Sequence, residues 1–171
     1  MARSTFSGPV RSLNGFITAG PDAVINITAE TTLTFAAHAG RIMEINDADG
    51  AVTLPTIQAD DASASAGPDD PNVNNQLGAV YRFYIGTDAT DLDIKTDGTD
   101  KFLGSLAIGI TDSTYKVFIP AASNDVISMN GSTLGGDKFS YLEIIALADN
   151  EYLVQGVLIG SGTIVTPFAD S

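Results

Sequence analysis

The chain has 171 residues, of which 44% are hydrophobic and 17% charged, so it has enough apolar material for a buried core and too little charge for a disordered chain. Eight basic residues face 21 acidic ones. The net charge of −13 argues against partners recognised through clustered Lys and Arg, such as nucleic acid or an anionic membrane. The absence of cysteine excludes disulfides, thiolate zinc sites and cysteine nucleophiles.

The first 21 residues form a basic segment ahead of an acidic body. They contain two arginines and no carboxylate, so their charge is +2 and that of the remaining chain is −15. Ser7-Gly8-Pro9 and Asn14-Gly15 interrupt regular structure. We predict an extended arm over residues 1–21 that orders on a partner's acidic surface, the alternative being a frayed terminus. The residues that we expect to contact that partner are Arg3, Phe6, Val10, Arg11 and Phe16.

From residue 22 onward, apolar and β-branched residues alternate with polar ones, as in half-buried strands. The predicted strands are 23–28, 32–35, 41–46, 51–55, 78–86, 91–96, 115–120, 125–129, 139–147 and 151–159, with 162–167 as a further edge strand. Further apolar residues come from 102–110, and Gly98 and Gly104 are predicted turn positions. No apolar run approaches the roughly 18 residues of a membrane-spanning helix, and the N-terminus lacks the apolar stretch of a signal peptide.

Two connections have turn signals. Asp49-Gly50 favours a tight hairpin between the strands on either side of it, and residues 148–150 favour a second hairpin between 139–147 and 151–159. The strands of the second hairpin are more continuously apolar than the earlier ones, so we expect both of their faces to be covered.

Residues 56–77 form an acidic, proline-containing insertion without a basic residue. Loops of this length are usually functional or disordered. We consider a solvated, variable loop, with a short helix at 57–64, or an exposed protrusion that contacts neighbouring subunits. The residues assigned to that contact are Asp60, Asp61, Asp69 and Asp70.

Side chains that support catalysis are scarce. The single histidine, His38, lies in a turn of small residues, and the sequence contains no recognisable nucleophile motif with which it could form a Ser-His-Asp arrangement. Acidic residues crowd one stretch, with Lys95 and Lys101 beside them, and those acids are Asp88, Asp91, Asp93, Asp97 and Asp100. We interpret them as a solvated strand face, the alternatives being a divalent cation site or a glycosidase carboxylate pair. A calcium loop at 47–50 lacks the further ligands of an EF-hand. We therefore predict no catalytic residue, metal or cofactor.

Strands separated by turns every 8–12 residues predict an all-β protein, an antiparallel β-sandwich or barrel of jelly-roll or tulip-like form. The predicted organisation is an extended arm over 1–21 followed by a single β domain over 22–171, with the acidic insertion at 56–77.

Several segments together resemble the head decoration, or cement, proteins of tailed phages. They are residues 1–16, Gly50-Ala-Val-Thr-Leu-Pro55, 78–85, 92–98 and Phe102-Leu-Gly104. The resemblance implies a homotrimer on the outer surface of the virion that bridges subunits of the major capsid protein and has no catalytic residues. A fibre or adhesin-type module that binds carbohydrate on the virion is the alternative, and an acid-based glycoside hydrolase is a third.

Overall fold

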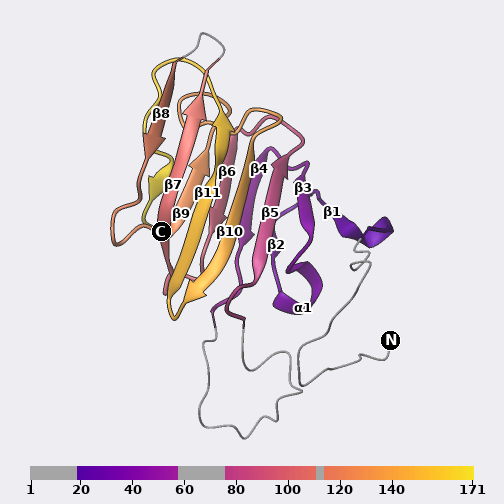
Figure 1. Ribbon diagram of the computed structural model, residues 1–171. Coiled ribbons are helices and arrows are strands. Elements are labelled where there is room, and N and C mark those ends of the chain that lie inside the picture. The colour runs from indigo at the N-terminus through magenta and orange to yellow at the C-terminus, as the bar shows by residue number, and fades with distance from the viewer. Residues whose placement is uncertain (1–18, 58–75, 111–113) are drawn as a thin grey trace, which may run out of the picture.

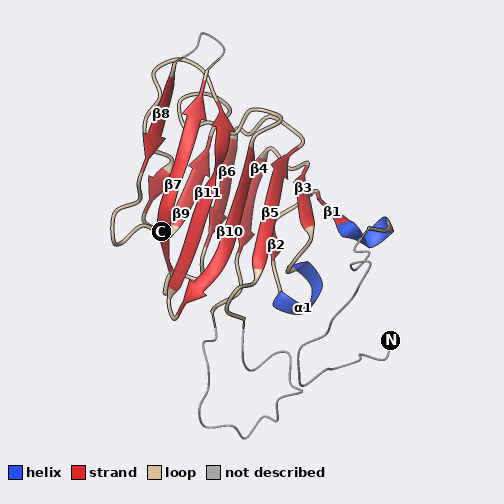
Figure 2. Cartoon of the chain, viewed as in Figure 1, coloured by secondary structure: helices blue, strands red, loops and turns tan. Residues whose placement is uncertain are grey.

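The computed structural model describes residues 19–57, 76–110 and 114–171, and these residues form a two-layer β-sandwich (Figures 1 and 2). The predicted all-β sandwich is therefore confirmed. A short 3₁₀ turn, η1 (Pro21–Ala23), precedes the first strand, and a single-turn helix, α1 (Phe35–His38), follows the second. The strands are β1 (Val24–Ile27), β2 (Thr31–Thr32), β3 (Ile42–Ile45), β4 (Asp49–Thr53), β5 (Val80–Ile85), β6 (Asp91–Lys95), β7 (Lys101–Gly109), β8 (Tyr115–Phe118), β9 (Val126–Met129), β10 (Tyr141–Ala148), β11 (Glu151–Ile159) and β12 (Phe168–Ala169).

The two layers are a seven-stranded sheet A and a five-stranded sheet B. Sheet A has the order β1-β3-β5-β10-β11-β7-β8, and sheet B has the order β12-β9-β6-β4-β2. The first six strands alternate between the sheets, so β1, β3 and β5 run parallel in sheet A while β2, β4 and β6 run parallel in sheet B. The β7–β11 pair is also parallel, and the other pairs are antiparallel. The sheets are thus mixed, and the predicted antiparallel pairing holds for five of the ten pairs among the described strands.

The connection at residues 47–50 explains that difference. It joins β3 in sheet A to β4 in sheet B, so it crosses between the layers and is not the predicted hairpin turn. A glycine with a positive φ is compatible with a hairpin turn and also with a crossing between the sheets. Gly50 has a φ of 111° and lies inside β4. Because a chain that changes sheet after every strand returns to the same sheet in the same direction, its neighbouring strands become parallel.

The acidic insertion lies in the second turn of this winding. Val24 of β1 is the register partner of Ile42 in β3, and Ile42 is in turn the partner of Arg82 in β5. The second of these intervals is more than twice as long as the first, and the whole difference is the segment 56–77. The insertion therefore lengthens one connection of a regular winding and leaves the pairing of its strands unchanged.

The inward side chains of both sheets form one core. Tyr81, Phe83 and Ile85 of β5 are fully buried, as are Leu92 and Ile94 of β6, in agreement with the predicted alternation. Burying a large apolar side chain contributes about 1.5–3 kcal/mol, so these alternating positions make a large contribution to holding the two sheets together.

The hairpin of β10 and β11 is confirmed, and its turn contains Asn150 at a φ of 61°. The hairpin lies in the middle of sheet A, between β5 and β7. The expectation that both of its faces are covered was wrong, because its outward residues Tyr141 and Val157 are exposed among the described residues.

Three local predictions also differ from the structure. The segment predicted as a strand at 32–35 ends β2 and begins α1, where alanines favour a helical turn and the Nδ1 atom of His38 accepts a hydrogen bond from the Thr34 N–H at 2.9 Å. The last edge strand is β12, just after the predicted 162–167. Gly104 lies inside β7 and not in a turn. Most of the predicted helix at 57–64 is outside the described residues.

None of the helices in the described ranges is long and apolar enough to span a membrane.

Candidate interaction surface

The acidic stretch from Asp88 to Asp100 supports the local fold. The Asp88 carboxylate accepts a hydrogen bond from the Lys138 N–H at 2.7 Å, and that of Asp93 accepts one from the Ser128 hydroxyl at 2.7 Å. Asp97 accepts bonds from the Thr56 hydroxyl and the Thr99 N–H. These carboxylates are spread along β6 and the turns at its two ends. Across residues 19–57, 76–110 and 114–171, no group of three or more His, Asp or Glu side chains is arranged to hold a metal ion.

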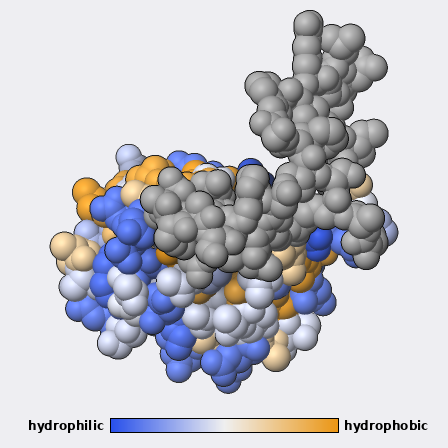
Figure 3. Space-filling view, turned by 90° about the horizontal axis from the view of Figure 1, so that it is seen from below, coloured by the Kyte–Doolittle hydropathy of each residue, from blue (hydrophilic) through white to orange (hydrophobic). Residues whose placement is uncertain are grey.

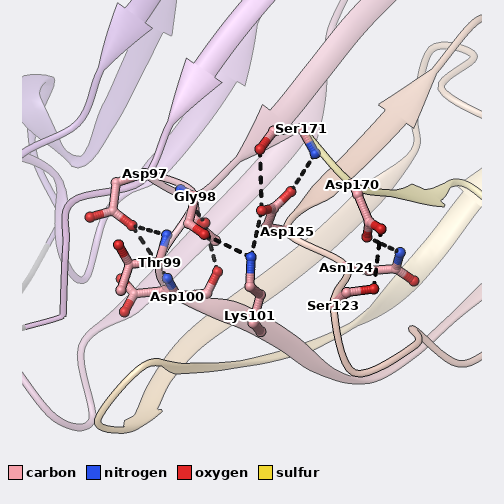
Figure 4. Close-up of polar contacts among 11 residues, drawn as sticks. Asp97, Gly98, Thr99, Asp100, Lys101, Ser123, Asn124, Asp125, Asp170 and Ser171 are labelled. Carbon is pink, nitrogen blue, oxygen red and sulfur yellow. Dashed lines mark hydrogen bonds and ion pairs between the residues drawn. The ribbon is translucent and has the colours of Figure 1, made fainter.

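A polar network at one end of the sandwich fixes the C-terminus (Figure 4). The Lys101 ammonium contacts the nearly buried Asp125 carboxylate at 2.7 Å, and the same carboxylate accepts hydrogen bonds from the backbone N–H and hydroxyl of Ser171. Beside it, Asp170 accepts bonds from Ser123 and Asn124. Burial raises the pKa of Asp125, but Lys101 and Ser171 together outweigh that effect and hold the pKa below its usual value. The network therefore stabilises the ionised carboxylate and ties the chain terminus to β9.

Next to this network, Asp100 is fully buried at the root of the acidic insertion. Its Oδ2 atom accepts a hydrogen bond from the Ile57 N–H at 2.8 Å, and its Oδ1 atom has no partner among the described residues. Burial raises the pKa of Asp100, and the neighbouring charges of Asp97 and Asp149 add to the rise. Because Ile57 lies at the start of the insertion, Asp100 anchors the first stem of that segment.

Two buried tyrosines line the same end of the core and differ in their hydrogen bonding. Their rings meet edge to face at 6.4 Å. The Tyr152 hydroxyl donates to the Pro55 carbonyl at 2.5 Å, whereas the Tyr81 hydroxyl has no partner among the described residues. Burial raises the pKa of Tyr81 to about 12, so its hydroxyl stays neutral at ordinary pH.

This difference gives a matched pair of substitutions. We expect Tyr152→Phe to lower the free energy of unfolding by about 1–2 kcal/mol, because it removes the donor to the Pro55 carbonyl. Tyr81→Phe removes a buried hydroxyl that has no partner among the described residues, so it is expected to be neutral or stabilising. Urea unfolding of both variants measures the difference, and equal losses would contradict this assignment.

A shallow hollow of about 450 Å³ lies between residues 19–23 and 39–41. Its charged lining residues are Asp22 and Arg41, and the others are small or apolar. We assign no chemistry to this hollow.

The outer face of sheet A carries a continuous line of apolar side chains, which we call the apolar row. The register aligns Tyr84 with Tyr141, Tyr141 with Val157, Val157 with Ala107, and Ala107 with Val117. The row thus crosses β5, β10, β11, β7 and β8 in that order. At about 4.8 Å per strand it extends roughly 19 Å. Figure 3, seen from below, shows hydrophobic residues gathered at the upper left margin among mainly hydrophilic ones.

Polar side chains border the apolar row on one side. Arg82, Glu143 and Gln155 lie on β5, β10 and β11, one step along from Tyr84, Tyr141 and Val157. Glu143 contacts Arg82 at 2.9 Å and accepts a hydrogen bond from Gln155 at 2.9 Å. The nearest charges on this side are therefore paired within the chain.

The residues predicted for partner contacts belong to two other segments of the chain. Arg3, Phe6, Val10, Arg11 and Phe16 of the arm, and Asp60, Asp61, Asp69 and Asp70 of the insertion, lie outside the described residues. Sequence reasoning missed the apolar row. Its signal was the apolar character of 139–147 and 151–159, which we attributed to strands covered on both faces.

Comparison with protein-family models, with curated proteins and with solved structures finds no match to this chain.

Proposed function

We propose that this protein is a non-enzymatic structural component of a phage virion, which decorates the outer surface of the capsid and stabilises it by bridging capsid subunits as an oligomer. The observation that carries the proposal is the apolar row. An uninterrupted apolar line on the outer face of an acidic protein suits assembly with other subunits, because large exposed apolar patches on soluble proteins mark interaction sites. The resemblance of the sequence segments to decoration proteins supplies the kind of assembly.

The proposed mechanism is multivalent clamping. Each subunit of an oligomer contributes one arm, and once the first arm binds the capsid, the others are held at a high effective concentration. The basic arm docks on the capsid, while the acidic body, with its charge of −15, faces solvent and keeps neighbouring oligomers apart. Weak individual contacts then combine into a stable clamp against outward pressure.

Removing the arm tests this mechanism. We expect deletion of residues 2–15 to abolish co-sedimentation with capsids of the virus that encodes the protein, while the circular dichroism spectrum of the β domain is unchanged. Arg3→Gln combined with Arg11→Gln is a milder variant, and its binding is expected to weaken without being lost, because it removes charge but retains the apolar contacts.

Two results would contradict the proposal. The first is unchanged capsid occupancy by the deletion variant, which would remove the arm from the mechanism. The second is a copy number in purified virions far below that of the major capsid protein, which would favour a fibre or adhesin-type module over decoration.

A further inference from the structure

We infer that the apolar row is the contact surface for a second copy of this chain, so that the protein assembles with itself through the outer face of sheet A near β8. The inference deepens the proposed function, because it names the surface that joins the subunits of the oligomer. It rests on that function only for the biological purpose of the oligomer, since self-assembly requires no capsid.

Several outward side chains of this surface are largely exposed. Val117 and Val157 are 56% and 55% exposed, and Tyr115, which precedes Val117 on the same face of β8, is 71% exposed. Exposed Ile119 directly follows β8. Because β8 is an edge strand of sheet A, its outer main-chain groups lie beside these side chains. An apolar edge strand without a covering partner promotes aggregation, so a soluble protein with this feature needs a specific partner there.

Phe139 provides a second observation at the same place. Its ring is exposed and lies 6.3 Å from that of Tyr84, the first member of the apolar row. The backbone of Phe139 has a φ of 76°, a left-handed conformation that is rare for bulky residues and costs about 1–3 kcal/mol. The fold thus accepts backbone strain at an exposed aromatic residue, and such strain is concentrated at functional positions such as ligand-contacting and switch residues.

The area of the surface fits a protein partner of ordinary size. Together, Tyr115, Val117, Phe139, Tyr141 and Val157 expose roughly 500 Å² of side chain, given that a whole aromatic side chain buries about 150–250 Å². A stable interface buries about 800 Å² on each partner, of which roughly 60% is apolar. The exposed apolar area therefore matches the apolar share of one standard interface.

Charge limits where two copies of this chain can meet. Two molecules of net charge −13 repel each other, so they can meet only where few unpaired acids would be buried. The apolar row has no acid between Tyr84 and Val117, and the bordering Glu143 is already paired with Arg82. Glu44 of β3 is the register partner of Tyr84, so an acid flanks the row at its β5 end, and the contact is centred toward β8. At the margin, the Lys138 ammonium lies 5.6 Å from the centre of the Phe139 ring and offers a cation to the acidic body of the other copy.

Analytical ultracentrifugation of the full-length chain, without capsids, tests the inference. We expect the natural protein to sediment as an oligomer and Val117→Lys combined with Val157→Lys to shift to the monomer, with at least tenfold weaker association. Val24→Lys is the matched control. Val24 is a 48% exposed strand valine at the opposite edge of sheet A, so this variant should remain assembled.

Phe139→Gly keeps the test decisive if the lysine variants fold poorly. Glycine adopts a φ of 76° without strain, so this variant is expected to fold at least about as well as the natural protein and yet to associate more weakly. A monomeric natural protein, unchanged association of the Val117/Val157 and Phe139 variants, or equal dissociation by Val24→Lys would overturn the inference.

Capsid binding separates this inference from the proposed function. A natural protein that assembles through the apolar row but does not bind capsids would contradict the capsid role and support the self-assembly surface. A natural protein that is monomeric yet binds capsids would overturn the self-assembly surface and the oligomeric clamp, while leaving the attachment to the capsid in place.

Discussion

Replacing Gly104 by alanine is expected to lower the free energy of unfolding by about 3–5 kcal/mol, within the range of severe single substitutions. Gly104 lies in β7 opposite Val154 of β11. Its φ is 97°, which side chains rarely adopt, and a Cβ atom there would overlap the Val154 carbonyl oxygen and the Leu153 side chain. Because the obstacle includes backbone in the middle of sheet A, relief requires the parallel β7–β11 pair to separate.

The matched control is Gly109→Ala, at the end of the same strand. A Cβ atom at Gly109 would meet no atom within 4 Å, and its φ is outside the left-handed range. This substitution is expected to be neutral or to stabilise by about 0.4–1 kcal/mol, through the lower entropy of the unfolded chain. Urea unfolding at pH 7 measures both variants. Similar free energies of unfolding for the two variants would contradict this prediction, because they would mean that β7 and β11 leave room for a Cβ atom at Gly104.

Asp125→Asn is expected to lower the free energy of unfolding by about 2–3 kcal/mol at pH 7. Removing one partner of a buried ion pair costs about 3–5 kcal/mol. The expected loss is smaller here because the Lys101 side chain is about one-third exposed and regains water once Asp125 is neutral. Asparagine keeps an acceptor for the Ser171 N–H, so the change mainly removes the charge.

The pH dependence of this loss identifies its cause. The pKa of Asp125 is lower in the folded protein than the value of about 3.9 in the unfolded chain. Its stabilisation is therefore complete above that unfolded value and disappears as the pH falls through the folded pKa. The difference between natural protein and variant should be constant near neutral pH and shrink below about pH 4.

Asp91→Asn is the control for Asp125, because Asp91 is an exposed carboxylate on β6. Its effect is expected to stay within about 0.5 kcal/mol, as for most surface substitutions. The pH dependence of stability that comes from Asp100 has the opposite sign to that from Asp125. Because the pKa of Asp100 is raised in the folded protein, its contribution to stability is lost as the pH rises through the folded pKa. A loss in Asp125→Asn that persisted undiminished at pH 3 would show that charge is not the reason for it.

The sequence predicted most of the strands and, for strands such as β5 and β6, which face is buried. Alternation is a local property, because successive side chains of a strand point to opposite sides wherever the strand lies. Tyr81, Phe83 and Ile85 could therefore be assigned to the core without knowing their neighbours. The β10–β11 hairpin was predictable for the same reason, since its turn lies between adjacent segments.

Only the tertiary structure decided which strands are neighbours and what surface they form together. Turn residues such as Gly50 permit a positive φ without revealing whether the chain reverses within one sheet or crosses to the other. The parallel winding of β1 to β6 depends on pairing between segments far apart in the chain, such as Asp49 with Asp91, which no local pattern encodes. The apolar row collects single residues from five strands, between Tyr84 and Val117, and each of them alone is an ordinary apolar residue on a strand. Their alignment follows from sheet register, because register depends on long-range pairing that becomes fixed only when the whole core packs.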